Sequence, residues 1–422
     1  MSTPGPFGGS NPLDKLLRDL LNVLSAGPVN WDVARQVAQA VAAQAGDVTV
    51  DPLLRIRAEE LLRVADLHVA DATGLSLSAT GRTLTLRAVV PRDWAELTLA
   101  AWQPLLEKLA EGLLSSMPPP DADDTGPEGV TATPFGDPNL LNNLPQMMMS
   151  ALFGMQAGTM AGQQAVTALG QYDLPIPRPL SDEILVVPST IAGFANDWSL
   201  PVDDTILWVL LREVTTHAVL ARPHVRERLE ELLAKFAGGF RADMSQLEDR
   251  LGSLDPLDLG ALQAALEDPG ALLASMETPV QGALHPAIDA LVAAVVGYVD
   301  HQMDRVGRRL IGSYGPLTEA LRRRRLEVGA DDQFVGRLFG LELGRTEYDR
   351  GSAFVNGVVE RAGEDGLARL WHSARELPTP AEVDAPGLWL ARIDLPAESD
   401  GPNGPDGSDG SDGSDGHDLG AS

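Results

Sequence analysis

The first part of the chain, residues 13–116, shows mainly helical spacing of its apolar side chains. Leucines and a valine recur at helical intervals over Leu16–Val23. Asn30 is placed to cap a helix that starts at Trp31, and a further helix is predicted over residues 52–71. Pro91 opens the next helix, because proline is favoured in the first helical turn. We therefore expect a small, mostly helical unit.

One segment of this unit alternates in the manner of a strand. Over residues 75–89, leucines at every second position alternate with serines or threonines, and Thr80-Gly81 lies between the two alternating runs. Two alternating runs separated by a glycine-containing turn are typical of a β-hairpin. The sequence therefore predicts one hairpin within the small unit.

The larger unit, residues 139–395, is predominantly helical by the same spacing. Glu183–Pro188 is its one short strand candidate. The predicted helices cover residues 203–220, 224–237, 243–251, 256–267, 286–311, 316–326, 330–343 and 347–363. Helix outweighs strand throughout, so the predicted fold class is mainly α with minor β (α+β).

Gly154, Gly158 and Gly162 recur at every fourth residue of one predicted helix. Small residues at this spacing lie on one helix face and let a neighbouring helix approach closely. Gln163 and Gln164 interrupt the apolar character that a membrane dimer would need. The spacing therefore predicts close helix packing in a core.

The ends of the chain and one internal segment lack the side chains that build a core. Residues 1–12 have no basic or long apolar region and are expected to be disordered rather than a secretory signal. Residues 117–138 form an acidic, proline-rich linker. Residues 396–422 form an Asp/Gly/Ser tail, which we interpret as a solubilising disordered end, with weak calcium binding or partner binding as alternatives.

Composition excludes several classes of protein. The 422 residues are 44% hydrophobic and 22% charged, as in ordinary globular proteins. A net charge of −28 argues against nucleic-acid binding. The absence of cysteine excludes disulfides and thiolate zinc sites. The most apolar stretch, Leu284–Val299, contains Pro286 and Asp289 and indicates a buried helix rather than a membrane span. We expect a cytoplasmic protein that binds neither nucleic acid nor membrane.

The helix predicted over residues 203–220 carries the most informative polar pair. Glu213 and His217 are four residues apart and share one helix face. In zinc hydrolases, two histidines at this spacing bind the metal and a glutamate after the first serves as general base. Here Arg212 and Thr216 occupy the two histidine positions. His217 follows one residue late, which rotates it by about 100° from the ligand position.

Longer motifs extend this similarity over residues 27–385. They comprise Gly27–Val37, Phe153–Gly158, Leu211–Leu220, Gly297–His301, Glu319–Arg325, Phe339–Leu343, Gly366–Trp371 and Leu377–Glu382. In these motifs the chain resembles an actinobacterial family of hydrolases that is described as zinc-dependent metallopeptidase-like. That family is often labelled as associated with deazaflavin coenzyme biosynthesis. The resemblance implies a zincin-like fold for the larger unit.

The resemblance also implies positions for the metal ligands. The family pattern His-Glu-x-x-His places its histidines at Arg212 and Thr216 and its base at Glu213. A ligand on a later helix falls at Val296, and a following histidine falls at Tyr298. All expected ligands are therefore replaced, while the general base remains. An arginine side chain repels a divalent metal ion because it stays protonated and positively charged.

Three functional hypotheses follow. The first is a degenerate, non-catalytic member (a pseudoenzyme) with a binding or scaffold role toward a protein or peptide and no expected cofactor. In this hypothesis Glu213 pairs with an arginine and His217 forms a hydrogen bond to the helix of Asp300. The second is an active zinc hydrolase with altered ligands, drawn from Glu213, His217, Asp300 and His301. The third is an anion- or partner-binding protein acting through Arg322–Arg325, although structural ion pairs also explain that run.

Overall fold

The computed structural model describes most of the two predicted units. The described residues are 27–46, 49–78, 80–115, 138–240, 278–326, 336–341 and 343–396, with the backbone alone for 138–147, 325 and 326. Several predictions lie wholly or mainly outside these residues. They concern the N-terminus, the helix at Leu16–Val23, the linker, the helices at 243–251 and 256–267, and the tail. Of the helix predicted at 330–343, residues 336–341 and 343 are described, and 336–339 are helical.

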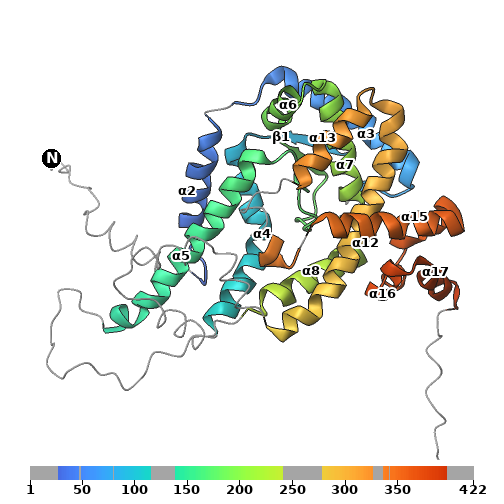
Figure 1. The fold of residues 1–422 in the computed structure, drawn as a ribbon. Coiled ribbons are helices and arrows are strands. Elements are labelled where there is room, and N and C mark those ends of the chain that lie inside the picture. Colours follow the sequence, from blue (N-terminus) through green and yellow to red (C-terminus); the bar gives the residue numbers. More distant parts are fainter. Residues whose placement is uncertain are drawn as a thin grey trace, which may run out of the picture.

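Helices dominate the described part of the chain (Figure 1). The α-helices are α2 (Trp31–Ala42), α3 (Pro52–Thr73), α4 (Pro91–Leu114), α5 (Pro138–Thr167), α6 (Pro188–Asp197), α7 (Val202–Leu220), α8 (Pro223–Ala237), α12 (Pro279–Leu310), α13 (Tyr314–Leu326), α15 (Arg345–Ala368), α16 (Pro380–Asp384) and α17 (Pro386–Asp394). Short 3₁₀ turns cover Ala43–Ala45, Arg369–Trp371 and Ala374–Glu376. The predicted fold class is confirmed: mainly helical with a small amount of strand.

Local signals set many helix starts. The Asn30 side chain accepts a hydrogen bond from the Val33 amide and caps α2, as predicted. Proline occupies the first turn of many helices, where the missing N–H costs nothing. The buried face of α2 is formed by Ala34, Ala38 and Ala42, whereas Val33, Val37 and Val41 are half-buried.

The predicted hairpin at residues 75–89 is wrong. Strand β1 (Thr85–Ala88) pairs in parallel with β2 (Glu183–Val186), so the two strands come from distant segments. Asp182 fixes this arrangement, because its Oδ1 accepts hydrogen bonds from the Ser78 hydroxyl at 2.9 Å and the Thr80 amide at 3.2 Å. The alternation identified a strand correctly but carried no information on its partner.

Helices α2 and α5 lie side by side along much of their length (Figure 1). A Cβ added at Gly158 would lie 2.3 Å from the Ala34 carbonyl oxygen, and one at Gly154 would lie 2.3 Å from that of Asn30. At Gly162 the nearest atom would be Cβ of Val41, at 2.6 Å. The predicted close packing at this glycine stripe is confirmed. The helix partner comes from the other side of the predicted linker, and a single core cluster spans both units.

Helix α12 runs through the centre of the larger unit and contacts α7, α8 and α15. Gly297 meets Gly351 of α15, where an added Cβ would lie 2.4 Å from a backbone atom. Among the described residues, one helix, α12, is long and apolar enough to cross a membrane. Within the fold, 61% of its most apolar 18-residue stretch is buried. A core helix passes the same test, and α12 supplies one wall of the candidate site.

Candidate functional site

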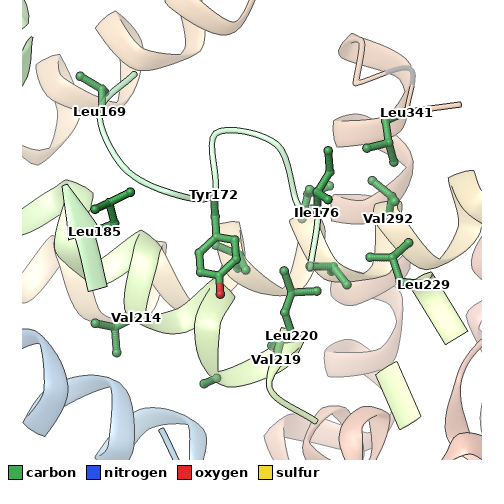
Figure 2. Packing of buried hydrophobic residues seen from close by; sticks show 14 of the residues in the cluster. Leu169, Tyr172, Ile176, Leu185, Val214, Val219, Leu220, Leu229, Val292 and Leu341 are labelled. Carbon is green, nitrogen blue, oxygen red and sulfur yellow. The ribbon is translucent and has the colours of Figure 1, made fainter. Parts of the chain in front are cut away.

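Helix α7 is buried along almost its whole length, and it carries the polar pair that the sequence singled out. Glu213 is 1% exposed and His217 is 4% exposed. Opposite them lies the irregular segment 168–182, which connects α5 to β2. Figure 2 shows Tyr172 of this segment with its hydroxyl directed toward α7, between the labelled Val214 and Val219. The site is therefore formed where this loop packs on α7.

Glu213 anchors the loop. Its Oε2 accepts hydrogen bonds from the backbone N–H groups of Gln171 at 2.9 Å and Tyr172 at 3.0 Å. Gly170 permits this approach, because a Cβ there would lie 2.3 Å from Cδ of Glu213. Burial raises the pKa of Glu213 to about 8, although Arg212 and the two amides favour the ionised form. The side chain thus holds local structure together and keeps its proton near neutral pH.

Arg212 lies beside this carboxyl group and is mostly buried, with its side chain 12% exposed. Its Nη1 donates to the Tyr172 carbonyl oxygen at 3.0 Å and lies 3.6 Å from Oε1 of Glu213. The same atom is 3.8 Å from Oδ1 of Asp173. The predicted pairing of Glu213 with an arginine is therefore confirmed. A guanidinium has no lone pair to offer a metal ion.

His217 points to a different partner from the one predicted. Its Nδ1 shares a hydrogen bond of 3.1 Å with the Tyr172 hydroxyl. Its Nε2 is buried and has no hydrogen-bond partner within the described residues. The predicted hydrogen bond from His217 to the helix of Asp300 is thus wrong, because the Tyr172 hydroxyl of the loop is the hydrogen-bond partner of the imidazole ring. Burial lowers the pKa of His217 to about 4, so the imidazole is neutral near pH 7.

The three replaced ligand positions do converge in space. Arg212 and Thr216 from α7, and Val296 and Asp300 from α12, line one cavity of about 10 Å³, which is at the lower limit for holding one water. The Thr216 hydroxyl donates to the Arg212 carbonyl oxygen at 2.9 Å. Among the described residues that line this cavity, Asp300 is the one carboxylate and none is a histidine.

The remaining candidate ligands do not complete a metal site. Nε2 of His301 lies 2.9 Å from Oε1 of Glu364 on α15, and the other oxygen of Glu364 accepts from Arg305 at 2.9 Å. Across the described ranges, no group of three or more His, Asp or Glu side chains is arranged to hold a metal ion. A catalytic zinc site needs about three protein ligands. The residues present here therefore do not fit the zinc ion that the resemblance implies.

Arg212 also lines a larger cavity, of about 500 Å³. Its described walls come from the end of α5, the loop, α7, α13, residues 337–341 and 343–344, and the first turn of α15. Arg212, Glu213 and Tyr348 are among the lining residues. The sequence did not predict this cavity, because its described lining is drawn from six segments and no single motif contains it.

The described arginines of the run at 322–325 differ in their surroundings: some lie on the surface and one is turned toward the protein interior. Arg323 pairs with Glu319 at 2.9 Å on the exposed face of α13. Arg324 turns inward, where it donates to the Thr167 carbonyl oxygen and stacks over the Phe194 ring at 5.8 Å. Arg322 is exposed, and the side chain of Arg325 lies outside the described residues. Structural contacts therefore account for Arg323 and Arg324.

Two residues of the site have no motif that marks them. Tyr172 and Gln171 contribute through backbone amides, a carbonyl and a hydroxyl, and these roles depend on the path of the loop. The one signal in the sequence is Gly170, since a glycine immediately before a buried polar stretch is typical of close backbone approach.

Comparisons with known proteins agree with this architecture. A family model described as zincin-like metallopeptidase matches residues 29–390. The chain is similar to a solved structure described as a putative hydrolase with a novel fold from Chloroflexus aurantiacus, at 26% identity and a TM-score of 0.59. The match covers 87% of this chain and 99% of the other. No curated protein matches. The chain belongs to the zincin-like metallopeptidase family.

Proposed function

We propose that this protein is a non-catalytic member of its family that binds a ligand at the inherited site rather than hydrolysing it with zinc. The observation that carries the proposal is the position of Arg212. Its guanidinium occupies the first ligand position, lines the small cavity and is held by the Tyr172 carbonyl at 3.0 Å. A permanent cation at this point repels a dication and removes one donor.

The state of the general-base residue supports the same proposal. Both oxygens of Glu213 contact groups of the protein itself, and burial raises the pKa of its carboxyl group to about 8. A general base must be ionised and within reach of the water or substrate it deprotonates. Glu213 therefore acts as a structural anchor for the loop.

An active zinc hydrolase with altered ligands is the main alternative. It requires Glu213 and His217 to leave their present partners and to meet Asp300 and His301. His301 faces Glu364 on α15, whereas His217 faces the Tyr172 hydroxyl. Reaching a common metal would thus break one buried and one part-buried hydrogen bond, which weighs against this alternative.

Binding through Arg322–Arg325 has less support. Arg324 is committed to contacts inside the protein, and Arg323 is paired on the surface. A cytoplasmic location, a peptide or protein partner and the association with deazaflavin coenzyme biosynthesis remain predictions of the sequence.

Restoring the ligands tests the proposal. We expect the variant Arg212→His/Thr216→His/Val296→Glu to gain one zinc equivalent in a competition titration with a chromogenic chelator, because these positions share one cavity. Wild-type protein should bind none. A matched control, Arg212→His alone, should also stay below one equivalent. Wild-type zinc binding as tight as that of the triple variant would refute the proposal.

A further inference from the structure

The cavity of about 500 Å³ has the size of a small-molecule site, for which about 300–1,000 Å³ is typical. One part of its wall is apolar. Leu169, Leu174, Val209, Leu321, Leu341 and Leu343 supply this part. Arginines interrupt the apolar wall, so the cavity combines a hydrophobic surface with fixed positive charge.

The positive groups come from four different segments. Arg212, Arg324, Arg337 and Arg345 line the cavity. The three acidic residues in the described lining are already engaged in local structure. Asp173 accepts from the Leu169 amide at 3.1 Å, Glu347 accepts from the Gly344 amide at 2.8 Å, and Glu213 accepts from the two loop amides. A single carboxylate, that of Asp173, lies 3.8 Å from both Arg212 and Arg324. The cavity therefore suits a negatively charged guest, in a protein whose overall charge is −28.

Arg212 has one edge available for such a guest. Within the described residues, every hydrogen bond and ion pair of its side chain runs through Nη1. The opposite edge, formed by Nε and Nη2, therefore has no partner among the residues that the structure describes. Two parallel N–H donors on a guanidinium edge match the two oxygens of a carboxylate or phosphate. Since the guanidinium is mostly buried, its position is fixed before any ligand arrives.

We propose that this cavity binds an organic anion, with its carboxylate or phosphate group paired to the Nε–Nη2 edge of Arg212 and its apolar body against the leucine wall. Arg337 is exposed at the same cavity and attracts the anion from solvent. The inference rests on the proposed function, because it names the ligand class of the same site. It assigns Arg212 a binding role at the position where the family resemblance implies a metal ligand.

Four probes test the ligand class by isothermal titration of chelator-treated protein. They are phenylbutyrate, phenylbutyl phosphate, phenylbutanol and inorganic phosphate. We expect one of the two organic anions to bind at least about tenfold more tightly than the alcohol, because a charged hydrogen-bonded pair is worth roughly 1.5–3 kcal/mol. Whichever organic anion binds more tightly identifies the headgroup. Inorganic phosphate should bind more weakly than the better organic anion, because it leaves the apolar wall uncovered.

Variants locate the binding. Arg212→Gln should weaken the better anion about tenfold, and Arg212→Lys should lie between because it keeps the charge but loses the planar edge. If the Arg212 variants do not fold, the exposed Arg337→Gln still tests the cavity, with an expected loss of about twofold to threefold that shrinks at high salt. Arg308→Gln is the control, since this arginine is 68% exposed on α12 and does not line the cavity.

The outcomes are decisive and separable. Equal binding of alcohol and anions, unchanged anion affinity in folded Arg212→Gln and Arg337→Gln, or no binding of any probe at millimolar concentration would overturn the inference. If the protein contains no zinc, each of these results would overturn the anion site alone and would leave the proposed non-catalytic function unaffected. Stoichiometric zinc in the wild-type protein would instead overturn the proposed function, whatever the probes do.

Discussion

The contact between α2 and α5 and the site between α7 and α12 both bring distant segments together, but they depend on different properties of the side chains. At the first contact, Gly154, Gly158 and Gly162 are needed for their shape, since backbone atoms fill the space beside them. At the second, Arg212 and Thr216 keep the positions expected of metal ligands while their chemistry differs. The position of a side chain in the fold can therefore be kept while its ability to bind a metal ion is lost.

The largest effect should come from breaking the first region by shape alone. Gly158→Ala would place a methyl group 2.3 Å from the Ala34 carbonyl oxygen, which the two helices can relieve only by moving apart. We expect a loss of roughly 3 kcal/mol in the free energy of unfolding, the upper end of overpacking costs. Urea denaturation measures it.

Gly193→Ala in α6 is the matched control for this variant. No atom lies within 4 Å of a Cβ built there, so alanine should be neutral or stabilise by up to about 1 kcal/mol through its better helix propensity. Equal stability of the Gly158 and Gly193 variants would show that shape does not control the α2–α5 contact.

The second effect tests the chemistry of the site through pH. The folded-state pKa of Glu213 is about 8 against an ordinary 4.5, so the folded protein keeps a proton that the unfolded chain has lost, and stability falls as pH rises toward 8. His217 acts oppositely between about 4 and 6.5, where only the unfolded chain is protonated. The two groups offset each other up to pH 6.5, and Glu213 alone acts from there to pH 8.

Glu213→Gln isolates this contribution, because the amide keeps the shape and cannot titrate. From pH 6.5 to pH 8 the wild-type protein should lose on the order of 2 kcal/mol more stability than the variant. Thermal or urea unfolding at a series of pH values measures the difference. Parallel stability curves for the two proteins would mean that Glu213 is ionised in the folded state.

A smaller effect should follow from removing the hydroxyl that meets His217. Tyr172→Phe deletes the 3.1 Å hydrogen bond with Nδ1 and leaves the ring packed, so we expect a loss of about 1 kcal/mol. A double-mutant cycle with His217→Ala separates the pairwise energy from the loss of the ring. Zero coupling in that cycle would contradict the assigned partner of His217.

Much of the fold could be predicted because its signals are local. Asn30 and Pro91 mark helix starts, and the fourfold glycine spacing in α5 predicts close packing. The hairpin prediction failed because alternation describes one strand, whereas the pairing of β1 with β2 depends on Asp182, about a hundred residues away.

The site was predictable only in part for the same reason. The replacement of the metal ligands could be read from residues on two helices, and the pairing of Arg212 with Glu213 followed from charge. The roles of Gln171 and Tyr172 could not be read, because backbone groups of an irregular loop supply them. The large cavity combines side chains from separate segments, so only the folded structure brings them together.

The central claim is that the inherited site does not hold zinc. Its most direct test is the zinc content of wild-type protein, purified without chelator or added metal and analysed by inductively coupled plasma mass spectrometry. Our account predicts far less than one zinc per chain, because Arg212 and Val296 stand where two of the donors would be needed. One tightly held zinc per chain that disappears in His217→Ala would contradict it.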